Sequence, residues 1–140
     1  MGTKTFAIIK PDAVKKGYTG KIYDRILQAG FNILSAKLLK MTNEQAEGFY
    51  NIHRERPFFN DLVKFMTSGP CMVLALEKSN AVEFWRETIG ATNPDEAKEN
   101  TIRKDFASNV QENAVHGSDS DENAEKEIAF FFTDAELLTD

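Results

Sequence analysis

The chain has 140 residues, 41% hydrophobic and 28% charged, with 8 Gly and 4 Pro, which excludes a disordered, collagen-like or low-complexity protein. Its length predicts one domain over residues 1–140 with a single packed core. The formal net charge of −5 argues against broad nucleic-acid or anionic-membrane binding, so an anionic ligand would need a local basic pocket.

The first part of the chain predicts a strand, a helix and a second strand. Thr5–Ile9 is β-prone and ends before Pro11, because proline lacks the N–H that a strand pairs with. Residues 19–28 carry apolar side chains at helical spacing and are followed by Gly30. Residues 31–39 then form the second predicted strand.

Two helices and a strand are predicted next. Thr42 and Gln45 form a capping-box pattern at the start of the first helix. A second short helix follows Pro57 and stops at Gly69-Pro70. Residues 71–77 are apolar enough to form a central strand.

The last third of the chain predicts a helix over residues 80–89, a helix from about Asp121 capped by Ser120, and a final strand over residues 128–132. Between them, residues 91–113 show no convincing period. A loop of this length is uncommon unless it is functional or disordered, and its apolar residues argue against disorder.

With the inserted helices set aside, the order is strand, helix, strand, strand, helix, strand. This order matches the ferredoxin-like βαββαβ arrangement, an α/β protein of the α+β sandwich type. The sequence therefore predicts a four-stranded antiparallel sheet with helices covering one face and a long functional loop.

The cellular compartment is predicted from cysteine use and from the absence of targeting segments. The only cysteine, Cys71, lies in an apolar run and is expected to be a small core residue rather than a reactive thiol. Met1–Phe6 contains no signal peptide, and no apolar stretch approaches the ~20 residues that span a bilayer. We therefore expect a cytoplasmic protein that does not enter membranes.

Two common kinds of site are absent from the sequence. There is no Gly-x-x-x-x-Gly-Lys-Ser/Thr loop and no Gly-x-Gly-x-x-Gly turn to cradle phosphates. There is also no Cys/His cluster with metal-ligand spacing. Any metal ion would therefore arrive with its ligand.

Two histidines are present, and their contexts differ. His116 precedes Gly117 and the helix cap at Ser120, a position where an imidazole can meet an anion at a helix N-terminus. It is a candidate nucleophile, and a structural turn histidine is the alternative. His53 has charged neighbours and is expected to be a solvated helix residue.

Three cations and one aromatic residue are further candidates. Lys10, Arg86 and Arg103 lie at element ends or in the long loop, where together they could clamp a triphosphate, although each alone could be an ordinary surface charge. Of Phe58 and Phe59, one should face away from the core. That residue could stack on a nucleotide base or pack against a helix.

Six short stretches carry a resemblance that spans the chain: Ile8–Val14, Arg56–Phe59, Ser68–Pro70, Gly90–Pro94, Thr101–Arg103 and Asn113–Ser120. Taken together and in this order, they closely resemble the nucleoside diphosphate kinases. The last stretch is the most specific of the six.

The resemblance implies transfer of the terminal phosphate of a nucleoside triphosphate to a nucleoside diphosphate through a phosphohistidine. Mg²⁺ would be the cofactor, carried by the nucleotide phosphates and not held in a metal site of the protein. His116 matches the phosphorylated histidine, Tyr50 a tyrosine beside it, and Glu127 a carboxylate that orients the imidazole. The resemblance also implies the residues that contact the nucleotide. Lys10 would contact ribose and phosphate and also belong to the catalytic residues. Phe58 would contact the base, Arg86, Thr92 and Arg103 the phosphates, and Asn113 the ribose.

The family also implies a homo-oligomer, either a hexamer or a tetramer. The sequence departs from the family pattern at Asn100, where glycine is common, and at Lys104, where a small residue is common. Asparagine tolerates the left-handed conformation, so we expect the loop to keep its path. Two other functions remain open: a catalytically idle nucleotide-binding module of the same fold, and a purely structural oligomer subunit.

Overall fold

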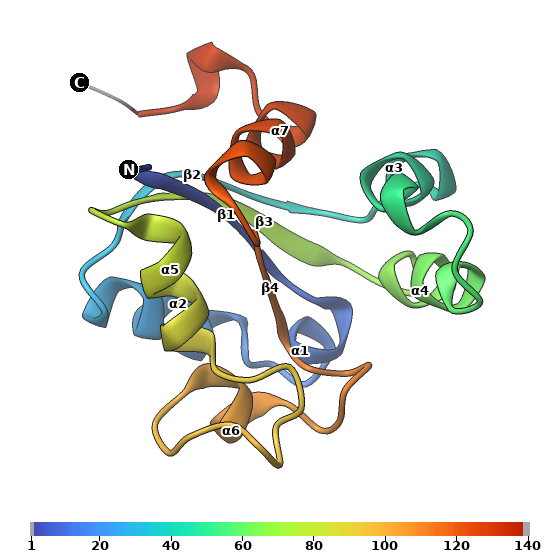
Figure 1. Cartoon of the computed structure of the whole chain (residues 1–140), viewed down its shortest axis with the longest axis horizontal. Coiled ribbons are helices and arrows are strands. Elements are labelled where there is room, and N and C mark those ends of the chain that lie inside the picture. Colours follow the sequence, from blue (N-terminus) through green and yellow to red (C-terminus); the bar gives the residue numbers. More distant parts are fainter. Residues whose placement is uncertain (1, 139–140) are drawn as a thin grey trace.

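A four-stranded antiparallel sheet forms the centre of the computed structural model, which describes residues 2–138 (Figure 1). Its strands lie in the order β2-β3-β1-β4, and each neighbouring pair is antiparallel. This is the ferredoxin-like arrangement, so the predicted fold class is confirmed. The strands are β1 (Lys4–Ile9), β2 (Asn32–Leu39), β3 (Cys71–Glu77) and β4 (Val115–Gly117).

The helices include those predicted and two short ones that the sequence did not indicate, α1 and α6. They are α1 (Pro11–Lys15), α2 (Thr19–Gln28), α3 (Asn43–Phe49), α4 (Phe59–Met66), α5 (Ala81–Ile89), α6 (Ile102–Phe106) and α7 (Asp121–Phe131), with 3₁₀ turns at Asn51–His53 and Asp134–Glu136.

Helices cover both faces of the sheet, so the prediction of one covered face is wrong. Alternate residues of β1 point to opposite faces, and Thr5 to Ile9 are all buried. Phe6 and Ile8 pack in the cluster beneath α3, α4 and α7, whereas Ala7 and Ile9 pack in the cluster beneath α2 and α5. Figure 1 shows α7 and α5 on opposite sides of the sheet. A central strand that is apolar on both faces needs this double cover.

The helix signals in the middle of the chain are confirmed. The Thr42 hydroxyl accepts the Gln45 N–H at 3.0 Å, and the Gln45 side chain accepts the Thr42 N–H at 2.9 Å, which completes the capping box. At the start of α4, Phe59 is buried while Phe58 is 47% exposed. One phenylalanine of the pair therefore faces away from the core, as predicted.

The predicted last strand over residues 128–132 is wrong, because α7 continues to Phe131. Ala124, Ile128 and Phe131 recur at helical spacing and form its buried face. Adjacent aromatic residues suggested a strand, yet Phe130 lies 45% exposed on the other side of the helix. The fourth strand is instead β4, which is only three residues long.

The segment over residues 91–113 is held by one basic side chain of α2. Arg25 forms an ion pair with Asp105 at 2.7 Å, and its second nitrogen donates to the Asn100 carbonyl at 2.6 Å. Asn100 has a φ of +69°, the left-handed conformation that glycine would adopt readily. The loop path therefore tolerates asparagine at this position.

Gly90 offers a test of the packing between α5 and the 91–113 segment. Its φ is +89°, and a Cβ added there would lie 2.6 Å from the Thr101 hydroxyl oxygen. Gly17 also has a positive φ, of +81°, but a Cβ there would meet no atom within 4 Å. We expect Gly17→Ala to lower the free energy of unfolding by about 1–2 kcal/mol. Gly90→Ala should lower it by roughly 1–3 kcal/mol more, because the clash adds to the backbone strain.

Urea unfolding of both variants measures the difference. Equal losses for Gly90→Ala and Gly17→Ala would contradict the close packing against Thr101.

Candidate active site

His116 lies on β4, at the edge of the sheet, and is held on both its backbone and its ring. In the register between β1 and β4 it pairs with Ile8, and its carbonyl accepts the Trp85 indole N–H at 3.1 Å. The imidazole meets the rings of Phe6 and Phe49 edge-on, with centroids 6.0 and 5.6 Å away. The position of the nucleophile predicted from the sequence is therefore rigidly defined.

Glu127 of α7 binds one nitrogen of this ring. Its Oε1 lies 2.9 Å from Nε2 of His116, so a neutral imidazole that carries its proton on Nε2 donates to the carboxylate. In that tautomer the lone pair is on Nδ1. The arrangement leaves Nδ1 as the nitrogen free to act as a nucleophile.

Ser118 completes this group and was missed in the sequence. Its hydroxyl donates to the same oxygen of Glu127 at 2.7 Å and accepts the Phe6 N–H at 3.2 Å. Ser118 stands two residues after His116 in extended chain, so both side chains project to the same side. That spacing is a signal in the sequence, but only the position of α7 shows what the hydroxyl contacts.

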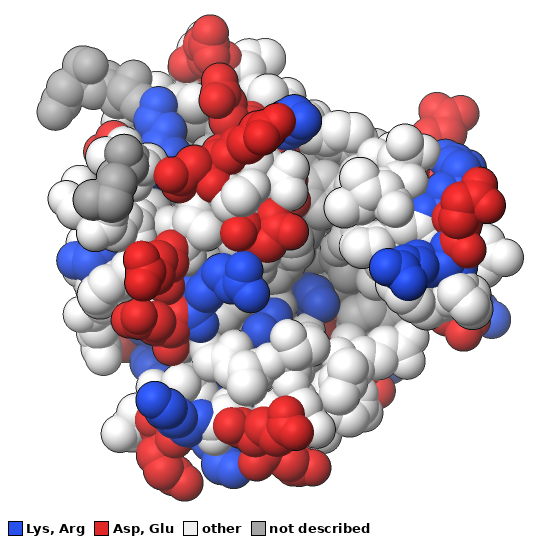
Figure 2. Space-filling model, viewed as in Figure 1, with Lys and Arg blue, Asp and Glu red and all other residues white. Residues whose placement is uncertain are grey.

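Two cavities lie at or next to His116, which lines the second, while its neighbour Gly117 lines both. The first, of about 600 Å³, is lined by three of the predicted phosphate contacts, Arg86, Thr92 and Arg103. Figure 2 shows Lys and Arg side chains gathered on the wall and floor of a hollow between the α3–α4 pair and the rest of the molecule. An acidic protein therefore presents local positive charge at this place.

The second cavity, of about 390 Å³, is lined by Tyr50, His116 and Glu127. Gly117 and Asp119 line both cavities, so the two meet beside His116. The structure thus brings the candidate nucleophile next to the candidate phosphate-binding groups.

Lys10, Asn113 and Thr92 come from distant parts of the sequence and are joined by hydrogen bonds. The Lys10 ammonium donates to the Asn113 side-chain oxygen at 2.8 Å, and the Asn113 amide donates to the Thr92 carbonyl at 3.3 Å. Burial, followed by repulsion from the nearby Arg103, lowers the pKa of Lys10 to about 8. A bound anion would therefore offset the repulsion between Lys10 and Arg103.

Arg103 is buried, and backbone carbonyls hold it in place. Its two terminal nitrogens donate to the carbonyls of Gly90 and Val115, each at 2.9 Å. Burial, followed by repulsion from Arg86, lowers the pKa of Arg103 to about 10. In the part of the chain that the structure describes, Lys10, Arg86 and Arg103 form no salt bridge with a carboxylate. Their charge is available to a bound anion.

Tyr50 is buried beside this group, and its hydroxyl has no hydrogen-bond partner within residues 2–138. Burial is the main cause that raises the pKa of Tyr50, with contributions from Cys71 and Glu127. The phenol is therefore neutral at physiological pH and can donate a hydrogen bond. Burial also raises the pKa of Cys71 to about 11, as expected for a small core residue rather than a reactive thiol.

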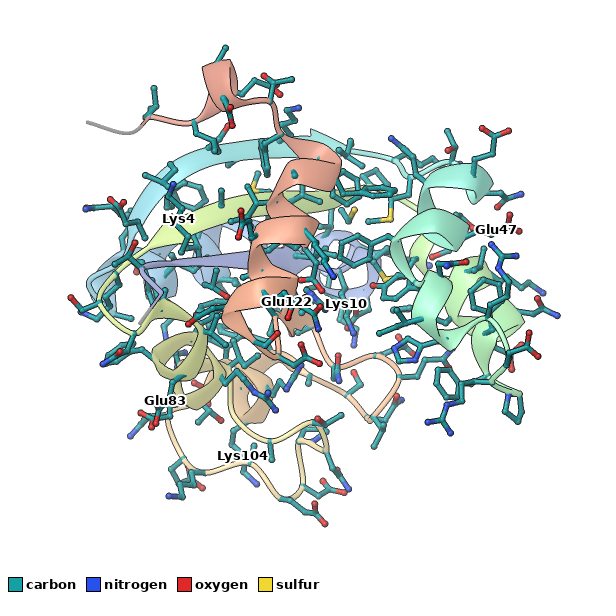
Figure 3. All side chains as sticks on the ribbon, turned by 45° about the horizontal axis from the view of Figure 1, so that its top comes forward. Lys4, Lys10, Glu47, Glu83, Lys104 and Glu122 are labelled. Atoms are coloured by element: carbon teal, nitrogen blue, oxygen red, sulfur yellow. The ribbon has the colours of Figure 1, made fainter. Side chains whose placement is uncertain are left out.

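Phe58 adjoins the second cavity through His53. The two rings lie 5.4 Å apart, and His53 lines the cavity. His53 belongs to a 3₁₀ turn and is half-buried, so the expectation of a solvated helix residue is wrong. Lys104, the neighbour of Arg103, is exposed and in Figure 3 lies at the rim of the molecule, whereas Lys10 lies near its centre.

Within residues 2–138, no group of three or more His, Cys, Asp and Glu side chains is arranged to hold a metal ion. Over the same range, no helix combines the length and the apolar character needed to cross a membrane.

The fold and the site together define a class of protein. An oriented imidazole with one free nitrogen lies near cations that form no salt bridge within residues 2–138, on a ferredoxin-like sheet. These are the parts of an enzyme that transfers phosphoryl groups through histidine.

Comparisons with known proteins identify the family. Residues 3–137 match the sequence model of the family described as nucleoside diphosphate kinase. The chain is 57% identical to the nucleoside diphosphate kinase of Geotalea uraniireducens and 53% identical to that of Geobacter sulfurreducens, in each case over 96% of this chain and 98% of the relative. This chain belongs to the nucleoside diphosphate kinase family.

Solved structures agree with this assignment. The Aquifex aeolicus nucleoside diphosphate kinase superposes with a TM-score of 0.94 at 46% identity, covering 96% of this chain and 98% of that one. A halophilic nucleoside diphosphate kinase from Halobacterium salinarum in complex with CDP superposes with a TM-score of 0.93 at 36% identity, covering 99% and 93%.

Substitutions of Glu127 test its contact with the imidazole. Glu127→Gln can still accept one hydrogen bond from Nε2, whereas Glu127→Ala leaves the ring free to turn. We expect the rate of phosphorylation of His116 to fall in the order wild type, Gln, Ala, with a loss for Ala of about 10–100-fold. Nucleotide affinity should change little.

Single-turnover phosphorylation measures this series. Glu125→Ala is the control, because Glu125 is an exposed acidic residue of the same helix. An orienting role for Glu127 is wrong if Glu127→Ala and Glu125→Ala phosphorylate at the same near-wild-type rate.

Proposed function

We propose that this protein transfers the terminal phosphate of a nucleoside triphosphate to a nucleoside diphosphate through a covalent intermediate on Nδ1 of His116. The contact between Nε2 and Glu127 is the observation that carries the proposal, because it leaves the other ring nitrogen free to attack. Membership of the nucleoside diphosphate kinase family supports the catalytic function over an idle nucleotide-binding module.

In the first half-reaction, the Nδ1 lone pair attacks the γ-phosphorus of the triphosphate. The bond from that phosphorus to the bridging oxygen breaks, and the nucleoside diphosphate leaves with the electron pair. The imidazole gains positive charge as the N–P bond forms, and the Glu127 carboxylate stabilises it. A second diphosphate then attacks the phosphohistidine and reverses these steps, so no general base is required.

The cations of the first cavity bind the phosphates in this mechanism. Arg86 and Arg103 line that cavity, and each Arg103 terminal nitrogen retains a second N–H besides the one given to a carbonyl. Lys10 and Thr92 bind phosphate, and Asn113 binds the ribose. These groups neutralise charge on the transferring phosphoryl oxygens, which is the main task of a protein in phosphoryl transfer.

Tyr50 acts beside the histidine. Its neutral hydroxyl lacks a partner among the described residues, so it can donate to a phosphoryl oxygen that enters the second cavity.

Mg²⁺ is the proposed cofactor, carried by the nucleotide phosphates. Such an ion would be held mainly by phosphate oxygens and water, the ligands that Mg²⁺ prefers. Asp119, the acidic residue that borders both cavities, is expected to contact that water shell. When bound, the ion neutralises phosphate charge.

The remaining proposals concern the protein as a whole. We propose that residues 1–140 form one domain that assembles into a homo-oligomer, a hexamer or a tetramer, as the family resemblance implies. A cytoplasmic location fits its one buried cysteine. ATP, GTP and other nucleotides are its partners, and no nucleic acid or membrane is expected because the net charge is −5.

A single nucleophile that serves donor and acceptor in turn predicts two half-reactions. Initial-rate plots should give parallel lines, and incubation with radiolabelled ATP should yield an acid-labile, alkali-stable phosphoprotein that a different nucleoside diphosphate discharges. His116→Ala should form none and should lose roughly 10³-fold or more of the activity. Intersecting lines without an isolable phosphoenzyme, or substantial activity in His116→Ala, would contradict the mechanism.

Phe58 predicts weak discrimination among bases. An exposed ring can stack on any purine or pyrimidine, while polar contacts go to ribose and phosphates. The CDP complex of the Halobacterium salinarum relative supports nucleotide binding in this fold. Phe58→Ala should weaken binding of every nucleotide by about 1–3 kcal/mol in calorimetric titration.

Ile52→Ala serves as the control for Phe58→Ala, because Ile52 is also an exposed apolar residue near the second cavity. A Phe58→Ala defect confined to purines would be inconsistent with one stacking platform for all bases.

A further inference from the structure

Asp12 is a buried acid that the proposed mechanism does not use. It is the second residue of α1 and is only 5% exposed, so its carboxyl group is removed from water. One oxygen, Oδ2, accepts the Ala114 N–H at 3.1 Å from 102 positions away along the chain. The other oxygen, Oδ1, has no hydrogen-bond partner in the described part of the chain. A buried acid is costly, so its position calls for an explanation.

Ala114 has a strained backbone. Its φ is +72°, and the Val115 N–H donates to the Asn113 carbonyl at 2.8 Å, which makes a tight three-residue turn around it. A residue with a Cβ adopts this conformation only where its surroundings impose it. The segment around Asp12 imposes this conformation by binding both backbone polar groups of Ala114. Asp12 accepts its N–H, and the backbone N–H of Lys10 donates to its carbonyl at 2.8 Å.

This turn sets the position of groups on each side of it. Asn113 is the first residue of the turn, and its side-chain oxygen accepts a hydrogen bond from the Lys10 ammonium. Val115 is the last residue of the turn, begins β4 and accepts a hydrogen bond from Arg103. His116 is the next residue of the strand, so a change in the turn would move both the ribose contact and the nucleophile.

Asp12 also provides negative charge beside Lys10. The groups that act on the Lys10 ammonium are Arg103 of α6, which repels it, Asp12, which attracts it, and the neutral amide of Asn113. Burial raises the pKa of Asp12, and Glu112 acts in the same direction, whereas Lys10 and the Ala114 N–H favour the carboxylate. Ionised Asp12 therefore opposes the loss of the proton from Lys10.

We infer that Asp12 is a positioning residue for phosphoryl transfer, which holds the Asn113–Ala114 turn in place and supplies the counter-charge of Lys10. This inference rests on the proposed function in one respect, since Lys10 is taken to bind the nucleotide. The hold on the turn and the charge on Lys10 are properties of the free protein.

Two substitutions separate these two roles. Asp12→Asn keeps the shape and an oxygen that can accept the Ala114 N–H, but removes the charge. Asp12→Ala removes both. Glu112→Gln is the matched control, because it removes one negative charge next to the same turn from a side chain that does not hold Ala114.

The first readout is the titration of the Lys10 side chain by NMR in the full-length protein without nucleotide, assigned by its loss in Lys10→Arg. The wild-type pKa is expected at about 8. In Asp12→Asn it should fall by roughly one pH unit or more, because an attractive charge has been removed. Glu112→Gln should not lower it, since Glu112 does not contact Lys10. An unchanged Lys10 titration in Asp12→Asn would overturn the inference.

The second readout is kinetic. At pH 6, where Lys10 is protonated in both proteins, Asp12→Asn should keep kcat/KM within about threefold of wild type, and at pH 8 it should lose roughly fivefold or more. Asp12→Ala should lose kcat at both pH values, because the turn is released. If Asp12→Ala lowers only the melting temperature and leaves the kinetic pH profile unchanged, the role is structural alone and the inference is wrong.

Failure of the proposed function has a different signature. Wild type and Glu112→Gln would then form no phosphohistidine at any pH, whatever the Lys10 titration shows.

Discussion

The register between β4 and β1 is the constraint on which the site depends. His116 lies opposite Ile8, and residues that pair directly across antiparallel strands project to the same face of the sheet. That face is the one beneath α7, where the Glu127 carboxylate contacts the imidazole ring. A slip of one residue would turn the imidazole to the face covered by α2 and α5. The backbone pairing of the three-residue strand β4 therefore decides whether the His116 imidazole can contact the Glu127 carboxylate.

Both ends of β4 are fixed by contacts that enforce this register. The strained Ala114 turn precedes the strand, and Ser118 follows it with its hydroxyl between the Phe6 N–H and the Glu127 carboxylate. The Trp85 indole binds the His116 carbonyl from the opposite face. Rigid support of this kind keeps a nucleophile in its reactive geometry without movement at the moment of reaction.

The electrostatics of the site follow from what the fold buries. Lys10 and Arg103 lose hydration and repel each other, and Arg86 adds to the repulsion. A protein with a net charge of −5 thus keeps one cluster of cations that form no salt bridge with a carboxylate among the described residues. Such a cluster is stabilised when an anion binds.

Long periodic elements were predictable from the sequence, whereas short ones were not. Residues 19–28 and 71–77 were predicted with their observed bounds, because the first carries a helical period and the second is a continuous apolar run. The three residues of β4 have no pattern of their own, since β1 stabilises them. Residues 128–132 were wrongly predicted as a strand because aromatic residues favour strands. In the structure most of this run belongs to α7, which buries only part of it.

The candidate site shows the same division. Its proposed principal groups were predicted from motifs along the chain, with His116 in the most specific stretch. The contacts of Ser118 and Asp12 were not predicted, because each joins residues that only the tertiary fold brings near.

The most direct test of this account is to identify the phosphorylated ring nitrogen by ³¹P and ¹⁵N NMR of the isolated phosphoenzyme. The contact between Nε2 and Glu127 predicts phosphate on Nδ1 of His116. Phosphate on Nε2, or on another residue, would contradict the account.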